Sequence, residues 1–396
     1  MKTVLYASAA SLALATAAAA AGHAVKVGVS LGFTGPIESL TPAMADSAEL
    51  ALAEVSDSGA FLDGKVIEPV RADSTCIDAG AATAAAERLV TSESVAAIMG
   101  ADCSGVTTAI ANNVAIPQGV VMVSPSATSP ALSTIEDNGL FFRTAPSAAR
   151  QGVVKATIMT DRGIADVAVT YTNNDYGKGL ADSFVAAYEG IGGSVTITAP
   201  HEDGKGDYSA EVGALAAAGG EILVVLGYAD QGGVGIMQTA IDTGAFETFA
   251  LGDGMFADSL LEALGADMEG TIGSVPWSQG EGADAFSALA EAAGGDAGGA
   301  FTRESYDAAA LIALAMQKGG AADRAAVAEN LLAVANAPGE PILPGELGKA
   351  LEILASGGEV DYIGATNVEL IGPGEASGTY REYEVKDGAY TTVTFR

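Results

Sequence analysis

The feature that most constrains this chain is an alternation of short strand-like runs with helical segments. In the first third, β-branched apolar runs are separated by segments whose apolar residues recur at helical spacing. The predicted strands are 25–31, 65–70, 95–99 and 120–123, and the predicted helices are 42–55, 79–90 and 106–114. Strands that alternate with helices form a parallel sheet covered on both faces.

The alternation restarts after Arg143. This second series has predicted strands at 167–171, 194–198, 222–226, 249–251 and 272–275, and predicted helices at 148–160, 178–188, 208–218 and 235–243. The chain has 396 residues, which exceeds one typical core. The sequence therefore predicts an α/β protein with two doubly wound, mainly parallel-sheet lobes.

The rest of the chain differs in character. After Trp277 the pattern is mainly helical, at 283–293, 303–317, 325–335 and 347–355. The stretch 379–394 alternates like an antiparallel hairpin, and Asp387 followed by Gly388 is a strong signal for its turn.

The first residues predict export. Lys2 is followed by an apolar and small-residue run over 5–21, and 21–24 offers small residues for cleavage. This pattern is typical of a signal peptide, here assigned to 1–24, and the alternative is a membrane anchor. No cysteine stands directly after the run, at the predicted cleavage site, which argues against a lipid anchor, so we expect a soluble protein.

Charge and cysteine content narrow the partners. With 18 basic and 50 acidic residues the net charge is −32, which disfavours nucleic acid and anionic lipid. Cys76 and Cys103 are the two cysteines of the chain, and in an exported protein such a pair favours a disulfide over two buried thiols. We expect no metal site, because zinc needs about four ligands.

Polar residues follow several predicted strands, where open parallel sheets place their ligands. Ser104 follows the strand 95–99, and Ser126 and Thr128 follow 120–123. Tyr176, Tyr228 and Asp253 follow three strands of the second series. Individually, Ser104 could be a helix N-cap and Asp253 an ordinary turn residue. As a set, hydroxyls from one lobe and a carboxylate from the other are complementary to a zwitterion.

At these residues the sequence resembles the periplasmic Leu/Ile/Val-binding protein family, the type I solute receptors of ABC importers. The resemblance extends over essentially the whole chain after 24, and it rests on the order and spacing of several motifs. These motifs are VGVSLGFTGP (27–36), IMGADCS (98–104), VSPSATSP (123–130), NDYGKG (174–179) and GDG (252–254).

The resemblance implies a role for each residue. Ser104 and Thr128 match hydroxyls that bind the ligand carboxylate, Thr128 also meets the ammonium, and Ser126 acts through its carbonyl. Tyr176 and Tyr228 match rings that close over the ligand, and Asp253 matches the acid that pairs with the ammonium. It also implies a Cys76–Cys103 disulfide near the site. Phe33, Leu40 and Trp277 are candidates for the pocket lining, and Leu40 departs from the tyrosine of the Leu/Ile/Val receptors.

The family also implies an architecture and a mechanism. Lobe 1 would comprise 25–143 and 279–365, and lobe 2 would comprise 144–278 and 366–396. Three crossings near 143–144, 277–278 and 362–366 would form a hinge that closes on the ligand. We expect a periplasmic monomer without a cofactor that delivers an amino acid to an ABC permease.

Three alternatives stay open. An enzyme is disfavoured: His201, the one histidine outside 1–24, falls in a polar segment predicted to be a solvated loop, and no Gly-x-Ser-x-Gly or phosphate-binding motif occurs, so no catalytic residue is assigned. A ligand sensor could use the same fold. The ligand could also be an amide, an aromatic acid or another small solute.

Overall fold

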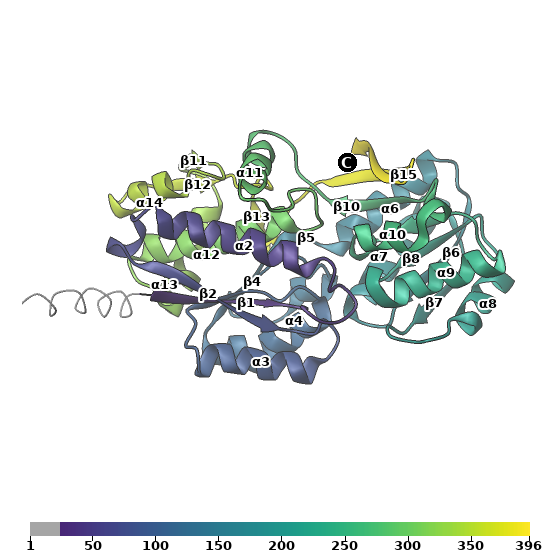
Figure 1. The fold of residues 1–396 in the computed structure, drawn as a ribbon, viewed down its shortest axis with the longest axis horizontal. Helices are drawn as coiled ribbons and strands as arrows, with labels where there is room; N and C mark the ends of the chain where they lie inside the picture. Colours follow the sequence, from purple (N-terminus) through teal and green to yellow (C-terminus); the bar gives the residue numbers. More distant parts are fainter. Residues whose placement is uncertain (1–23) are drawn as a thin grey trace, which may run out of the picture.

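A computed structural model describes residues 24–396 and shows two lobes, each built on a seven-stranded sheet (Figure 1). The first sheet has the order β13-β14-β5-β4-β3-β1-β2. Its strands are β1 (Ala24–Leu31), β2 (Val66–Asp73), β3 (Ala97–Gly100), β4 (Val121–Ser124), β5 (Phe141–Pro146), β13 (Leu370–Ile371) and β14 (Glu375–Ala376). Neighbouring strands pair in parallel except β13 with β14.

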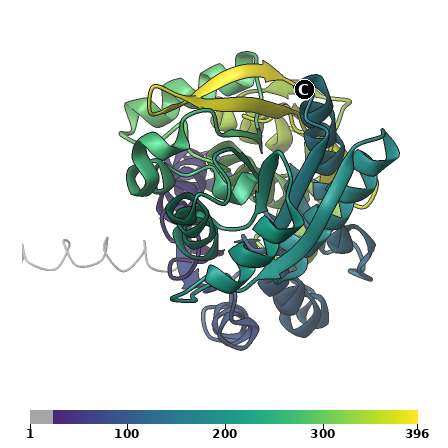
Figure 2. The same ribbon diagram turned by 90° about the vertical axis from the view of Figure 1, so that its right-hand side faces the viewer.

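The second sheet has the order β16-β15-β10-β9-β8-β6-β7. Its strands are β6 (Asp166–Thr172), β7 (Ser194–His201), β8 (Ile222–Leu226), β9 (Phe249–Leu251), β10 (Ile272–Pro276), β15 (Tyr380–Lys386) and β16 (Ala389–Phe395). The strands from β7 to β10 pair in parallel, and β15 and β16 are added antiparallel at the edge. This edge hairpin turns at Asp387 and Gly388, as predicted, with φ angles of 52° and 75°. In Figure 2 the hairpin is the yellow pair of strands at the top.

Helices cover both sheets. The first lobe has α2 (Thr41–Asp57), η1 (Phe61–Asp63), α3 (Ala79–Thr91), α4 (Ser104–Ile110), η2 (Ala111–Ala115), α5 (Ile116–Gln118), η3 (Pro130–Thr134), α11 (Glu281–Ala292), α12 (Thr302–Gly319), α13 (Arg324–Ala335) and α14 (Leu347–Ala355), with a small ribbon of β11 (Glu340–Ile342) and β12 (Val360–Tyr362). In Figure 1, α2 and α12 lie on one side of the first sheet, and α3 and α4 lie on the other. Residues 302–317 of α12 are all buried, as expected for a helix that packs on all sides.

The second lobe is covered in the same way. Its helices are α6 (Ala148–Asp161), α7 (Asp175–Gly190), α8 (Ser209–Ala218), η4 (Ala229–Gly233), α9 (Val234–Thr243), η5 (Asp253–Met255), α10 (Asp258–Leu264) and η6 (Gly265–Met268). Strands that alternate with helices on both faces confirm the predicted fold class of two doubly wound, mainly parallel lobes.

The chain passes between the two sheets three times. It does so between β5 and α6, between β10 and α11, and between β14 and β15. The third crossing therefore lies after Ala376, not at 362–366, because β13 and β14 belong to the first sheet. Strands of two residues have no periodic pattern in the sequence that could reveal them.

His201 is also placed differently from the prediction. Strand β7 continues to His201, whose side chain is 1% exposed, so the solvated loop predicted there is wrong. The prediction failed because the polar residues after it suggested an earlier strand end.

The predicted signal peptide, 1–24, lies outside the described residues except for Ala24, which begins β1. Within 24–396, no helix is both long and apolar enough to cross a bilayer.

Candidate functional site

A narrow cavity lies between the two lobes and is lined by residues of both. The loops after strands of both sheets surround it, as expected for facing parallel sheets. The first lobe contributes Ile37, Leu40, Met44, Asp102, Cys103, Ser104, Ser126 and Phe301, and the second contributes Tyr176, Tyr228, Asp253 and Gly254. Five of the six predicted ligand-binding residues are therefore brought together, and Thr128 is the exception.

The hydroxyl residues of the first lobe form one polar wall. The Ser104 hydroxyl accepts a hydrogen bond from the Ser129 amide at 3.0 Å, so it ties α4 to the loop after β4. The Ser126 hydroxyl donates to the carbonyl of Asp102 at 3.1 Å. Thr128 is not among the lining residues, but it is fully buried and its Oγ1 has no hydrogen-bond partner among the described residues. An orphaned buried hydroxyl costs free energy unless a ligand or water completes it.

Two stacked tyrosines form the opposite wall. The rings of Tyr176 and Tyr228 lie 5.1 Å apart between centroids, with an interplanar angle of 17°. Both side chains are buried. Among the described residues the Tyr228 hydroxyl has no hydrogen-bond partner of normal geometry, although the side chain of Asn174 lies beside it.

The carboxylate of this wall is Asp253, which is 1% exposed. The Tyr176 hydroxyl donates to its Oδ1 at 2.5 Å and accepts from the Gly254 amide at 3.1 Å. Burial raises the pKa of Asp253, while the Tyr176 hydrogen bond and the charge of Lys155 oppose that rise. A cationic group in the cavity would compensate for the desolvation of this carboxylate.

Lys155 supports Asp253 from within the second lobe. Its ammonium group is fully buried and donates to the carbonyl of Leu251, two residues before Asp253. Burial lowers the pKa of Lys155 to about 8, and the charge of Asp253 acts in the opposite direction. No sequence motif marks Lys155, because it lies in the middle of the helical pattern of α6.

The loop that carries Tyr228 packs against the polar side chains of His201 and Asp203. His201 Nδ1 and the Thr170 hydroxyl lie 2.8 Å apart, and Asp203 accepts from the Gly232 amide at 3.1 Å. A Cβ atom on Gly227 would lie 2.9 Å from His201 Nε2, so only glycine fits beneath Tyr228. Burial lowers the pKa of His201 to about 4, so the imidazole is neutral at pH 7.

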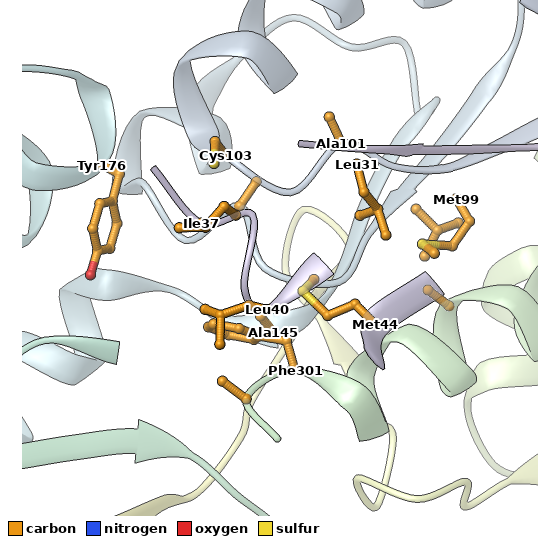
Figure 3. Packing of buried hydrophobic residues seen from close by; sticks show 14 of the residues in the cluster. Leu31, Ile37, Leu40, Met44, Met99, Ala101, Cys103, Ala145, Tyr176 and Phe301 are labelled. Carbon is orange, nitrogen blue, oxygen red and sulfur yellow. The ribbon is translucent and has the colours of Figure 1, made fainter. Parts of the chain in front are cut away.

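The remaining lining is apolar and comes from the first lobe. Ile37, Leu40, Met44 and Phe301 form this part, and Figure 3 shows them grouped with Tyr176 standing across from them. Leu40 was predicted, whereas the other three were missed. Met44 lies in the apolar pattern of α2, and Ile37 and Phe301 lie in loops without a recognisable motif, so the sequence offered no signal that separates them from core residues.

Two predicted lining residues lie elsewhere. Phe33 is not part of the cavity, and the Arg71 guanidinium lies 5.5 Å from its ring centroid. Trp277 lies between Arg303 and Arg381, whose guanidinium carbons are 4.0 and 4.9 Å from its ring centroid. Both rings take part in cation–π contacts, and neither is among the residues that line the cavity.

The predicted disulfide is present. Cys76 and Cys103 are bonded, with Cα atoms 5.1 Å apart, and Cys103 lines the cavity. Beside it, the buried Asp102 carboxylate accepts from the Gly32 amide, the Ser74 hydroxyl and the Cys103 amide. These three donors indicate that Asp102 holds three loops together. No group of three or more potential metal ligands occurs within residues 24–396.

Comparison with known proteins gives a consistent result. The family model described as periplasmic binding protein matches residues 24–348. A leucine-, isoleucine-, valine-, threonine- and alanine-binding protein of Pseudomonas aeruginosa is 27% identical over 79% of this chain and 83% of its own length.

Two further comparisons extend over more of the chain. A chemotactic signal transduction substrate-binding protein of Halobacterium salinarum, BasB, is 29% identical over 94% of this chain and 89% of its own length. The solved structure of a leucine-binding protein, LivK, from Thermotoga maritima superposes with a TM-score of 0.76 at 24% identity, over 94% of this chain and 98% of that one. At that identity the structural likeness shows the shared fold.

Proposed function

The chain belongs to the periplasmic binding protein family, and on that premise we propose that it captures an amino acid with an aliphatic side chain between its lobes and delivers it to an ABC permease. The family places the protein outside the cytoplasm, and the periplasm is the compartment we propose. The proposal assigns the chain a binding role without catalysis, as a monomer.

The observation that carries the proposal is the pairing of a buried carboxylate with buried hydroxyls across one cavity. Asp253 offers negative charge on the second lobe, and no lysine, arginine or histidine is among the described residues that line the cavity. An ammonium group is the ligand feature that fits this wall. Ser104 on the first lobe supplies a neutral donor for a carboxylate, which therefore needs no basic side chain. Thr128 does not line the cavity, but its buried hydroxyl has no partner among the described residues and is a second candidate donor.

The apolar part of the cavity lining supports the aliphatic side chain. The wall formed by Ile37, Leu40, Met44 and Phe301 presents no hydrogen-bonding side chain. Burial of apolar ligand atoms against it is worth about 25 cal/mol for each Å² removed from water. A charged ligand side chain would lose its hydration there without compensation. The P. aeruginosa relative, named for leucine, isoleucine, valine, threonine and alanine, agrees with this choice.

Thermal unfolding of the purified chain against a panel of ligands tests the proposal. The panel holds the common amino acids, their amides and hydroxybenzoates. A ligand that binds only the folded state raises the Tm with its excess over Kd. We expect a rise with leucine, isoleucine or valine and none with the matching amides. A rise restricted to hydroxybenzoates, on protein freed of carried-over ligand by unfolding and refolding, would contradict the proposed ligand class.

A second candidate function is ligand sensing. The H. salinarum relative is named as part of a chemotactic signal transduction system, and it matches 94% of this chain. Deletion of the gene separates the two roles. Lost uptake of radiolabelled leucine with normal chemotaxis supports transport, and the reverse result supports sensing.

A further inference from the structure

Direct hydrogen bonds join the two lobes at one edge of the cavity. The Ser39 amide donates to Oδ2 of Asp230 at 2.8 Å, and the Asp230 amide donates to the carbonyl of Pro36 at 3.1 Å. The Ser259 hydroxyl donates to Oδ1 of Asp230 at 2.7 Å and lies 3.1 Å from the Ser39 hydroxyl. Pro36 and Ser39 belong to the first lobe, and Asp230 and Ser259 to the second.

The contacts of Pro36 and Ser39 with the second lobe can form only when the lobes are together. The bond between Ser259 and Asp230 lies within the second lobe and holds the Asp230 carboxylate in place. Pro36 and Ser39 lie in the loop between β1 and α2, whereas Asp230 lies in η4 and Ser259 in α10. Hinge opening separates the two sheets and breaks each bond that crosses between them. No ligand atom takes part in these hydrogen bonds. The free energy that they contribute to the closed form therefore adds to the free energy contributed by the ligand.

The same two loops also line the cavity. The loop of the first lobe carries Ile37 and Leu40 beside Pro36 and Ser39, and the loop of the second lobe carries Tyr228 two residues before Asp230. The second loop is held in turn by the Gly232 amide, which donates to Asp203. Lobe contact at Asp230 therefore positions both walls of the cavity at once.

We infer that Asp230 is a positioning residue, a latch that stabilises the closed form and slows ligand release without touching the ligand. This inference rests on the proposed function only for its ligand-binding measurement. A contact present only in the closed form raises the closed population and lowers the apparent Kd by the same factor. Opening must precede release, so the latch acts on the dissociation rate, whereas ligand enters the open form at an unchanged rate.

The test replaces Asp230 and measures opening and release separately. Asp230→Ala is compared with wild type by small-angle scattering without ligand and by stopped-flow kinetics with L-leucine. Glu247→Ala is the matched control, because Glu247 is an exposed acid of the same lobe with no interlobe hydrogen bond among the described residues. We expect a larger radius of gyration for Asp230→Ala, dissociation about tenfold faster, and an association rate within about threefold of wild type.

Each outcome decides the inference. Equal radii and equal dissociation rates for Asp230→Ala and Glu247→Ala overturn it. Ser259→Ala removes the contacts that α10 makes with Ser39 and Asp230. The latch predicts that this variant also releases ligand faster than wild type, by a smaller factor than Asp230→Ala. A folding defect in Asp230→Ala would therefore not hide the effect. If wild type binds neither leucine nor any other amino acid, the proposed ligand class fails, and the radii alone decide the latch.

Discussion

Gly179 lies so close to Pro130 across the cleft that a Cβ atom on it would sit 2.7 Å from Pro130 Cδ and 3.2 Å from the Ser129 hydroxyl. Gly179 belongs to α7 of the second lobe, and Pro130 begins η3 of the first. A proline ring cannot move aside as the end of a flexible side chain can. At this point the backbone of the second lobe packs directly against the proline ring of the first lobe. The contact is steric, whereas the contact at Asp230 is made by hydrogen bonds.

Replacement of Gly179 by alanine should prop the cleft open. We expect the Kd for L-leucine to rise about tenfold or more, because the closed form must relieve the new contact. The Tm of the ligand-free protein should stay equal or rise slightly, since alanine favours a helix over glycine by about 1 kcal/mol. Calorimetric titration and thermal unfolding measure the two quantities. Gly190→Ala, in the same helix with open space around its Cβ, is the control, and an equal loss of affinity there would contradict the explanation.

Asp253→Asn should weaken binding of an amino acid by about 10-fold to 100-fold, as expected for loss of a charge-assisted hydrogen bond. Burial raises the pKa of Asp253, so wild-type affinity should fall as the pH drops toward that raised pKa and protonates the carboxylate. The affinity of the Asp253→Asn variant should not show this fall with decreasing pH. Titrations from pH 8 to pH 4 test both points, with 2-hydroxyisocaproate as a leucine analogue without the ammonium. A variant that loses affinity equally for both ligands would argue against an ammonium at Asp253.

Leu40→Phe should shift the preference toward smaller side chains. Leu40 is part of the apolar wall, and a larger ring there takes space from the ligand. One methylene in an apolar pocket is worth about 1–3 kcal/mol. We therefore expect the ratio of leucine to valine affinity to fall about tenfold in competition titrations. Phe33→Leu, outside the cavity, should leave that ratio unchanged, and a change there would show that the cavity extends to Phe33.

The buried His201 imidazole should lower the free energy of unfolding under mildly acidic conditions. Its folded pKa is about 4, below the ordinary value of 6.5, so the neutral imidazole stabilises the fold above pH 6.5 and that contribution is lost as the pH falls toward 4. Between pH 7 and pH 5 this amounts to about 2 kcal/mol in the free energy of unfolding. Urea unfolding at both pH values isolates it as the difference between wild type and His201→Gln. Parallel pH profiles for the two proteins would mean that His201 is already charged at pH 5.

The fold was largely predictable because its signal is local and repeated. A strand such as β8 is an apolar run whatever surrounds it, and its periodicity differs from that of α9 beside it. The hairpin β15–β16 was equally visible through Asp387 and Gly388. The short strands β13 and β14 were not, since two residues cannot display a period.

The candidate site was likewise predictable where its residues follow a local sequence pattern, and not elsewhere. Ser104, Ser126, Tyr176, Tyr228 and Asp253 could be named because each follows a strand, and parallel sheets direct those ends to one edge. Phe33 and Trp277 are not among the residues that line the cavity, and the sequence could not show this, because side-chain direction along a loop is not periodic. Their contacts with Arg71, Arg303 and Arg381 show where the rings lie.

The sequence by itself determined the two lobes, the polar character of the strand ends and the Cys76–Cys103 pair. Only the tertiary structure decided that Phe301 meets Leu40, that Lys155 lies beneath Asp253 and that Asp230 reaches Ser39. The physical reason is the distance along the chain over which each interaction acts. Backbone hydrogen bonding and apolar periodicity act between near neighbours in the chain, whereas a binding cavity is made by residues far apart in sequence whose distances depend on how whole sheets pack and close.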